Sequence, residues 1–346
     1  MKAKVYLDRN ESQFPLSPAC RGIIKSKYQK YLLRYTDKSI DSVQNKLLEK
    51  LQNLTGIDKT NIALGDGCEE ILKICFDHFI KKGDKVLLAD KSWGHYKTLI
   101  EAAGGAPVYF NLAENRDRYR YDIASFKKNY KKYSPKIVII TSPNNPTGNS
   151  IQFKLLCDFI KTAKKSIFIL DQAYWGFEDE NKNQLKKILT MHNKILITRS
   201  FSKYLGMPGI RLGYCIAGDY FKSVKESLNP YLGFNQLSIL LGLSALNDLS
   251  YYKKIAKIIS DEKQKYYDGL KNSKIFKIYK TDTNFLIIKF LPTLEKELRD
   301  SVEASTFSLS FPKEEANKYL LRITISDPAI NKKVLSLLLR IDKRSR

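Results

Sequence analysis

Short runs of apolar residues alternate with amphipathic segments along the middle of this chain. The apolar runs are rich in β-branched residues, and they are KVLLAD (85–90), KIVIIT (136–141), SIFILD (166–171), KILITRS (194–200) and RLGYCIA (211–217). Between them, residues 69–79 and 153–164 have the apolar spacing of helices. Strands that alternate with helices are typical of an α/β fold, in which helices cover a largely parallel sheet. The sequence therefore predicts an α/β fold.

The alternation of apolar runs with amphipathic segments changes after about residue 245. A long apolar helix is expected at 235–247, an amphipathic helix at 250–270, short strands at 284–290 and 319–325, and a final helix near 331–341. This change predicts a second, smaller α+β domain. We expect the large domain to span residues 40–245, and the small domain to combine residues 1–39 with 246–346. The 346 residues, 43% of them hydrophobic, are enough to bury the cores of both.

The chain is strongly basic, with a formal net charge of +24. One stretch, KKNYKKYSPK (127–136), interleaves tyrosines with lysines as a nucleic-acid-binding patch does. No nucleic-acid-binding motif accompanies the charge, so we interpret it as a solvated, lysine-rich surface and expect no nucleic-acid partner. Such a surface still attracts small anionic substrates.

Cysteine and histidine spacing excludes two other classes of protein. The five cysteines are scattered, with no C-x-x-C pair and an odd total, which favours reduced thiols in a cytosol. The three histidines lack the spacing of metal ligands, so no metal site is expected.

The first residues lack the apolar core of a signal peptide, and the apolar stretch 231–246 is interrupted by Asn235 and Gln236. A cytoplasmic protein without a membrane span is therefore expected.

Three segments rich in polar residues follow successive predicted strands. SPNNPTG (142–148) comes after one strand, Asp171 closes the next, and Ser200 to Lys203 close a third. In an open parallel sheet, ligands bind beyond the carboxyl ends of the strands. We therefore expect these segments to meet in one crevice.

The residues of this crevice match the chemical needs of pyridoxal phosphate. Lys203 supplies an amine for the aldehyde, and burial beside Arg211 would lower its pKa. Asp171 supplies a carboxylate for the ring nitrogen, which keeps the ring able to accept electrons. The amide of Asn145 and the hydroxyl of Tyr174 are suited to flank the ring oxygen.

The cofactor's phosphate and ring face also have candidate partners. LGDGCEEIL (64–72) places Gly67, Cys68 and Glu69 at a helix start, where free N–H groups and the helix dipole attract an anion. Ser200, Ser202 and Arg211 would complete the phosphate site, and Trp93 in KSWGHY (91–96) offers a flat face to the ring. Taken singly, each feature has a structural alternative, such as a turn for NNPTG or a helix cap for Asp171. Their joint occurrence at strand ends favours the site.

Four motifs resemble those of one enzyme family. They are SPNNPTG, DQAYWGF (171–177), RSFSKYLGMPGIRLGY (199–214) and LLRITIS (320–326). Over nearly its whole length the chain resembles the fold-type I pyridoxal-phosphate enzymes of the class I/II aminotransferase group, most closely the histidinol-phosphate aminotransferase branch. The resemblance implies a three-layer large domain, a Schiff base on Lys203, binding of the cofactor phosphate by Arg211, and binding of the substrate carboxylate by Arg322.

Two further segments carry roles only through this resemblance. LDRNES (7–12) is similar to a segment that lines the substrate pocket, which makes Asn10 a candidate substrate-binding residue. RYTD (34–37) is similar to an R-Y-P-D segment whose tyrosine, here Tyr35, reaches the phosphate in the partner subunit. The resemblance therefore implies a homodimer.

The chain also departs from the family pattern. Members that act on histidinol phosphate carry a G-x-x-V-R element whose arginine binds the substrate's phosphate, and here STFSLSFPKEEANKY (305–319) contains no arginine. Trp175 and Gly176 replace smaller and acidic residues after the tyrosine, which predicts a different pocket shape.

The leading interpretation is a pyridoxal-phosphate-dependent aminotransferase. It would move an amino group, with glutamate as the expected donor, to a small keto or aldehyde acceptor, phosphorylated or not. The alternative is a pyridoxal-phosphate-dependent decarboxylase of an O-phospho amino acid (phosphoserine or phosphothreonine), because that reaction uses the same cofactor site. A cofactor-binding regulator fused to a DNA-binding module is disfavoured, since no helix-turn-helix segment precedes the aminotransferase-like sequence.

Overall fold

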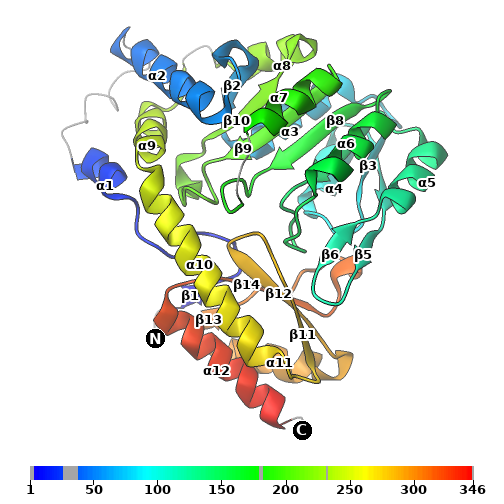
Figure 1. The fold of residues 1–346 in the computed structure, drawn as a ribbon, viewed down its shortest axis with the longest axis vertical. Helices are drawn as coiled ribbons and strands as arrows, with labels where there is room; N and C mark the ends of the chain where they lie inside the picture. Colours follow the sequence, from blue (N-terminus) through cyan, green and yellow to red (C-terminus); the bar gives the residue numbers. More distant parts are fainter. Residues whose placement is uncertain (1–3, 26–37, 179–181, 231–232, 345–346) are drawn as a thin grey trace.

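The computed structural model describes residues 4–25, 38–178, 182–230 and 233–344. They form a large lobe around a seven-stranded sheet and a smaller lobe around a three-stranded sheet (Figure 1). The long helix α10 (Leu249–Leu270), yellow in Figure 1, runs from the large lobe into the small one. Tyr35 lies outside the described residues.

The large sheet is mostly parallel, as the sequence predicted. Its strands, in spatial order, are β2 (Ile62–Gly65), β10 (Gly213–Ala217), β9 (Ile195–Ser200), β8 (Ile167–Gln172), β7 (Ile137–Thr141), β3 (Lys85–Ala89) and β4 (Ala106–Phe110). Strand β10 runs antiparallel to both of its neighbours, and the other neighbouring pairs are parallel.

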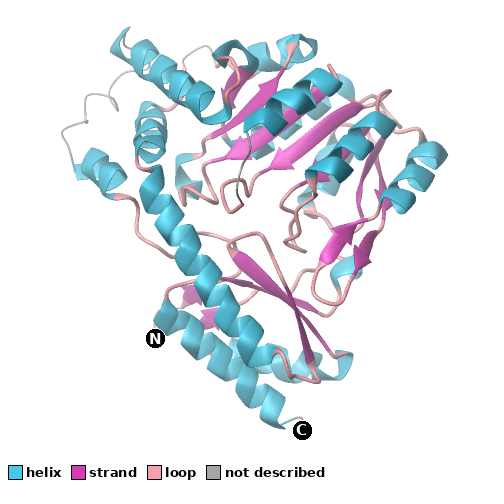
Figure 2. Cartoon of the chain, viewed as in Figure 1, coloured by secondary structure: helices cyan, strands magenta, loops and turns pink. Residues whose placement is uncertain are grey.

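Helices cover both faces of this sheet and make three layers (Figure 2). One face packs against α3 (Gly67–Phe79), α4 (His95–Ala102) and α8 (Lys222–Ser227). The other packs against α2 (Lys38–Thr55), α5 (Ile123–Tyr133), α6 (Phe153–Thr162), α7 (Lys182–Met191) and α9 (Gln236–Asn247). Along β7, Ile137 and Ile139 face the first set while Val138 and Ile140 face the second. Burial on both faces explains why the strands read as continuous apolar runs.

The small lobe contains the predicted second set of strands and helices. Its antiparallel sheet joins β11 (Phe276–Tyr279), β12 (Phe285–Phe290) and β14 (Leu320–Thr324). Its core also takes side chains from α10, α11 (Glu295–Glu303) and α12 (Pro328–Arg344). A short parallel pair, β1 (Val5–Tyr6) with β13 (Phe307–Ser308), brings the N-terminal segment to this lobe. Short 3-10 turns lie at Lys59–Asn61, Pro208–Ile210, Asp219–Phe221, Pro292–Leu294 and Glu315–Asn317.

The N-terminal segment contributes to both cores. Leu7 packs in the core of the small lobe, whereas Cys20 on α1 (Pro18–Lys25) packs in the core of the large lobe. The domain limits of 1–39, 40–245 and 246–346 stay a prediction.

A β-hairpin ties the two lobes together. It consists of β5 (Leu112–Glu114) and β6 (Tyr119–Tyr121), and it projects from the large lobe toward β11 and β12 (Figure 1). Glu114 accepts hydrogen bonds from Lys277 (2.8 Å), Tyr279 (2.6 Å) and Lys289 (2.9 Å). These contacts fix the small lobe over the carboxyl ends of the large sheet.

Within the described ranges, no helix is long and apolar enough to cross a membrane. The same ranges hold no group of three or more His, Cys, Asp or Glu side chains that could bind a metal ion.

Candidate active site

A cavity of about 600 Å³ lies between the two lobes, at the carboxyl ends of β7, β8 and β9. Every predicted site residue in the described part of the chain lines it, and these are Asn10, Gly67, Cys68, Glu69, Trp93, Asn145, Asp171, Tyr174, Ser200, Ser202, Lys203, Arg211 and Arg322. The three polar segments singled out in the sequence therefore meet, as expected.

Lys203 projects into this cavity from the loop after β9. Its Nζ donates hydrogen bonds to the main-chain oxygens of Arg9 (3.2 Å) and Asn10 (3.3 Å). Burial lowers the pKa of Lys203 to about 8, and the positive charges of Arg322 and Arg211 add to this effect. A substantial share of the amine is therefore neutral near physiological pH, which is the form that attacks an aldehyde.

Asp171 lies in β8, near its carboxyl end, and its carboxyl group is buried. It accepts hydrogen bonds from the hydroxyl of Tyr96 (2.5 Å) and the main-chain N–H of Ala173 (2.9 Å). Burial raises the pKa of Asp171, while these hydrogen bonds oppose the rise. A protonated ring nitrogen would give this buried carboxylate a cationic partner.

Sequence reasoning missed Tyr96. The segment KSWGHY was singled out for Trp93, but Tyr96 is the residue that contacts Asp171, and its hydroxyl also lies 2.9 Å from Thr141 Oγ1. Tyr96 is fully buried at the start of α4. The available signal was its place in the same strand-end segment. Trp93 lines the cavity and packs edge-on against Tyr96, and its stacking on the cofactor ring stays a prediction.

The expected phosphate site is a tight junction between α3 and the loop before β10. Gly67, the first residue of α3, has a φ of 85°, and a Cβ there would lie 2.9 Å from Arg211 Nη2. Arg211 Nη2 donates a hydrogen bond to the Asp66 carbonyl (3.2 Å), and Ser202 N donates to Ser200 Oγ (3.0 Å). The helix N-terminus, a guanidinium and two hydroxyls thus surround a space that suits a phosphate.

Arg322 reaches the cavity from β14 of the small lobe. Its Nη1 donates to Asn145 Oδ1 (2.6 Å) and its Nη2 to the Asp8 carbonyl (2.7 Å). Its buried Nε has no hydrogen-bond partner among the described residues, and a substrate carboxylate would supply one. Across the cavity, Asn10 Nδ2 donates to the hydroxyl of Tyr174 (2.8 Å).

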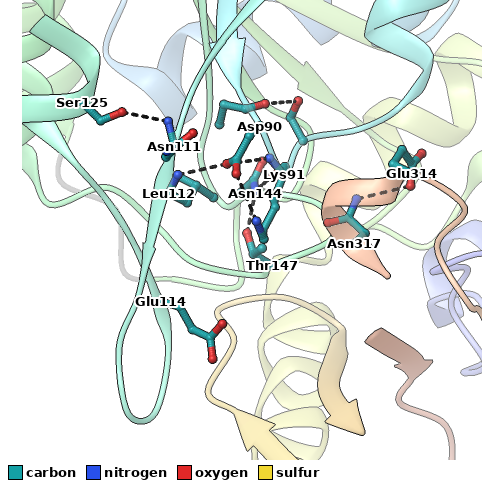
Figure 3. A network of polar contacts seen from close by, with 12 residues as sticks. Asp90, Lys91, Asn111, Leu112, Glu114, Ser125, Asn144, Thr147, Glu314 and Asn317 are labelled. Carbon is teal, nitrogen blue, oxygen red and sulfur yellow. Dashed lines mark hydrogen bonds and ion pairs between the residues drawn. The ribbon is translucent and has the colours of Figure 1, made fainter. Parts of the chain in front are cut away.

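A polar network holds the turn that carries Asn145 (Figure 3). The side chain of Asn144 donates to the Lys91 carbonyl (2.6 Å) and to Thr147 Oγ1 (2.5 Å). Asp90 Oδ1 in turn accepts from the main-chain N–H groups of Lys91 and Leu112, both at 2.9 Å. The turn is therefore anchored to the segment after β3 rather than free to move by itself.

The two residues that depart from the family pattern after Tyr174 lie behind the cavity and not in its wall. Trp175 and Gly176 were expected to change the shape of the substrate pocket, but neither lines the main cavity. Trp175 Nε1 donates to the Ser200 carbonyl (3.0 Å), and a Cβ on Gly176 would lie 2.5 Å from the Tyr204 ring. These residues pack behind the site, so their effect on substrate choice is not a direct contact.

The donor set fits pyridoxal phosphate. Lys203 offers an amine, Asp171 a buried carboxylate, and the α3 N-terminus with Arg211 a phosphate site, all around one cavity. The individual roles of these residues stay proposals.

Comparison with known proteins agrees with this chemistry. The family model for class I and II aminotransferases matches residues 2–338. A histidinol-phosphate aminotransferase of Ruminiclostridium cellulolyticum is 32% identical over 330 residues, covering 93% of this chain and 88% of the relative. One from Thermoanaerobacter pseudethanolicus is 30% identical, covering 94% of this chain and 89% of the relative.

Solved structures share the fold. The histidinol-phosphate aminotransferase of Sinorhizobium meliloti in complex with pyridoxal-5'-phosphate matches with a TM-score of 0.88 at 19% identity, covering 100% of this chain and 92% of the other. The enzyme of Clostridium acetobutylicum matches with a TM-score of 0.86 at 21% identity, covering 98% and 99%. Both confirm the predicted fold.

Proposed function

Because this chain belongs to the class I and II aminotransferase family and is a pyridoxal-phosphate-dependent aminotransferase, we propose that glutamate is its amino donor and a small keto or aldehyde compound its acceptor. The observation that carries this proposal is the meeting of Lys203, Asp171 and Arg322 around one cavity. An amine, a carboxylate for the ring and a guanidinium for the substrate anion are the three groups that transamination requires.

Bound pyridoxal phosphate supplies an electrophilic aldehyde and a ring that stabilises negative charge on the substrate's α-carbon. We assign the proton transfers at that carbon to Lys203 Nζ, whose lowered pKa suits a base near neutral pH. Arg322 would hold the substrate's anionic group through its unpartnered Nε and orient the α-carbon toward Lys203. Asp171, supported by Tyr96, would keep the ring in its protonated, electron-accepting form.

The names of the relatives suggest one acceptor to test first. They are histidinol-phosphate aminotransferases, so the keto counterpart of histidinol phosphate is a candidate acceptor. These relatives do not favour the decarboxylase alternative. Residues 305–319 contain no arginine, however, which sets this chain apart at the site expected to bind a substrate phosphate.

A half-reaction tests the proposed donor. The purified holoenzyme is mixed with L-glutamate, and the absorbance of the bound aldehyde form and the release of 2-oxoglutarate are followed together. Loss of that absorbance with one equivalent of 2-oxoglutarate per site supports the proposal. Carbon dioxide release from O-phosphoserine, without any 2-oxoglutarate from glutamate, would contradict it.

We further propose that the enzyme works as a homodimer in the cytoplasm. The resemblance of RYTD (34–37) to a segment that acts in a partner subunit supports the dimer. The described residues contain five free cysteines, four of them buried, which suits a reducing compartment.

A further inference from the structure

The small-lobe wall of the cavity includes residues 310–314, which belong to the segment 305–319 that the family resemblance linked to binding of a substrate phosphate. This segment is held in register with the strand that carries Arg322. Ser310 N donates to the Arg322 carbonyl (3.1 Å), and Arg322 N donates to the Ser310 carbonyl (2.8 Å). The residue that pairs with Arg322 is therefore a neutral serine. This pairing places no second cation beside the Arg322 guanidinium, which is the expected binding site for the substrate's anionic group.

Glu314 extends from this wall to the large lobe. A Cβ added to Gly94 would lie 2.0 Å from Glu314 Oε1, so the carboxylate occupies space that Gly94 leaves open. The other oxygen, Oε2, accepts a hydrogen bond from Asn317 Nδ2 (3.2 Å), and Asn317 is fully buried (Figure 3). Among the described residues, no lysine or arginine forms an ion pair with Glu314. An exposed carboxylate without an ion-pair partner among the described residues therefore lies at the cavity, next to Gly94.

Glu314 lines the same cavity as Arg322, four residues after the Ser310 that pairs with Arg322. Burial lowers the pKa of Arg322, while Tyr174, Glu314 and Asp8 oppose that shift, so these groups lie within electrostatic reach of the guanidinium. Lys203 and Arg211, which are assigned to the cofactor, also line the cavity, and so do two further cations. The Arg9 guanidinium lies over the Tyr6 ring, 5.3 Å from its centroid, and Lys313 is exposed and has no fixed partner among the described residues. Neither gives Arg322 the rigid second guanidinium that would offset Glu314.

The chemistry of the two candidate anions differs at this point. In histidinol phosphate, a phosphooxymethyl group takes the place that the carboxylate has in histidine. An enzyme that accepts both glutamate and histidinol phosphate must therefore admit a carboxylate and a phosphate to the same part of the cavity. A carboxylate carries one negative charge, whereas a phosphate monoester carries about −1.5 to −2 at pH 7. A carboxylate near this guanidinium opposes the binding of both anions, and it opposes the more highly charged phosphate more strongly.

We infer that Glu314 is a specificity-determining residue, which favours a carboxylate over a phosphate at the anion site of Arg322 and so favours α-keto acids as acceptors. This inference rests on the proposed aminotransfer from glutamate, and it narrows the acceptor of that reaction. Glu314 acts here through charge repulsion rather than by contact with the reacting atoms.

Matched pairs of amino compounds test the inference on the holoenzyme. L-Histidine and L-histidinol phosphate share one side chain, and L-alanine and 1-aminoethylphosphonate share another. Dissociation constants are measured by spectral titration. We expect the carboxylate member of each pair to bind more tightly to the wild type. The Glu314→Gln variant should shift each ratio toward the phosphorus-bearing member by about threefold, as expected for an exposed charge.

Two further variants separate charge from position. Gly94→Ala alters no charge but displaces the Glu314 carboxylate, so it should shift both ratios in the same direction as Glu314→Gln. Glu315→Gln removes the neighbouring carboxylate, which lies outside the cavity and 3.9 Å from Lys318, and it should leave both ratios unchanged.

The outcomes distinguish this inference from the proposed function. Tighter wild-type binding of the phosphorus-bearing member in both pairs would overturn the inference, as would ratios that Glu314→Gln leaves unchanged. Equal shifts in Glu314→Gln and Glu315→Gln would also overturn it. Failure of L-glutamate to convert the holoenzyme would instead contradict the proposed donor, while the binding ratios remain measurable.

Discussion

Arg322 on β14 donates a hydrogen bond from Nη1 to the side-chain oxygen of Asn145, across 2.6 Å. This contact joins the small lobe to the turn after β7 in the large lobe. The group expected to hold the substrate and a group expected to hold the cofactor are thus fixed relative to each other, so the docking of the lobes determines the geometry of the site.

Replacing Arg322 with lysine should weaken substrate binding while preserving a positive charge. Lysine cannot reproduce the planar fork that contacts Asn145, Asp8 and a carboxylate together. We expect kcat/KM for L-glutamate to fall about tenfold to a hundredfold in Arg322→Lys, because a hydrogen bond to a charged group is worth about 1.5–3 kcal/mol. Steady-state kinetics with a parallel titration of pyridoxal phosphate checks this. A variant with unchanged kcat/KM would remove Arg322 from substrate binding.

Replacing Tyr96 with phenylalanine should lower the affinity of the protein for pyridoxal phosphate. The change removes a 2.5 Å hydrogen bond to the buried carboxylate of Asp171, whose pKa burial already raises. Hydrogen bonds to charged groups are worth about 1.5–3 kcal/mol, so the dissociation constant of pyridoxal phosphate should rise at least about tenfold. Absorbance titration of the apoenzyme measures this.

The matched control for that change is Tyr130→Phe. The Tyr130 hydroxyl lies 3.0 Å from Ser166 Oγ and outside the cavity, so this variant should bind the cofactor as the wild type does. A normal cofactor affinity in Tyr96→Phe would show that the hydrogen bond from Tyr96 to Asp171 does not contribute to cofactor binding.

Sequence reasoning predicted the features that depend on neighbouring residues. The runs at 85–90, 136–141, 166–171 and 194–200 became β3, β7, β8 and β9, within one or two residues of each limit. Their continuous apolar character follows from burial on both faces, which a pattern reveals directly. The placement of polar residues at their carboxyl ends then followed from the geometry of a parallel sheet.

Features set by distant segments could not be predicted in this way. The direction of β10 depends on pairing with β2 and β9, and the run 211–217 does not encode it. The hydrogen bonds of Lys203 to the carbonyls of Arg9 and Asn10 use main-chain atoms, which carry no residue-specific signal. The Glu314 carboxylate of the small lobe packs against Gly94 of the large lobe, and these two residues lie far apart in the sequence.

Glu114 should make the docking of the lobes sensitive to acid. Burial favours its protonated form, but hydrogen bonds from Lys277, Tyr279 and Lys289 outweigh it and lower its pKa from 4.5 to about 2. The carboxylate therefore stabilises the folded state above pH 4.5, and this contribution is lost as the pH falls toward about 2. The free energy of unfolding should fall across this window in the wild type.

Glu114→Gln tests this account of the hairpin. The variant should be less stable at pH 7 by about 1 kcal/mol, a typical value for an exposed charge network, and its stability should depend less on pH below 4.5. Chemical denaturation at several pH values measures both effects. Glu49→Gln removes an exposed partner of Lys59 in the large lobe and serves as control. Identical pH profiles for Glu114→Gln and the wild type would contradict the account.

The proposed dimer can be tested by mixing inactive subunits. Tyr35→Phe and Lys203→Ala chains are each expected to be impaired, because one lacks the proposed phosphate contact and the other lacks the amine. If Tyr35 acts in the partner subunit, a mixed dimer contains one complete site, so activity should return after the two variants are unfolded and refolded together. Activity that does not rise above that of the separate variants would place Tyr35 in its own subunit's site or outside the site.

Covalent trapping of the cofactor tests the central assignment most directly. The holoenzyme is reduced with borohydride, digested, and analysed by mass spectrometry for lysines that carry a pyridoxyl group. We predict this group on Lys203 in the wild type and its absence from Lys203→Ala, with Lys222→Ala as an exposed control that is labelled at Lys203 normally. A pyridoxyl group on a different lysine, or an unlabelled wild-type Lys203, would contradict the assignment.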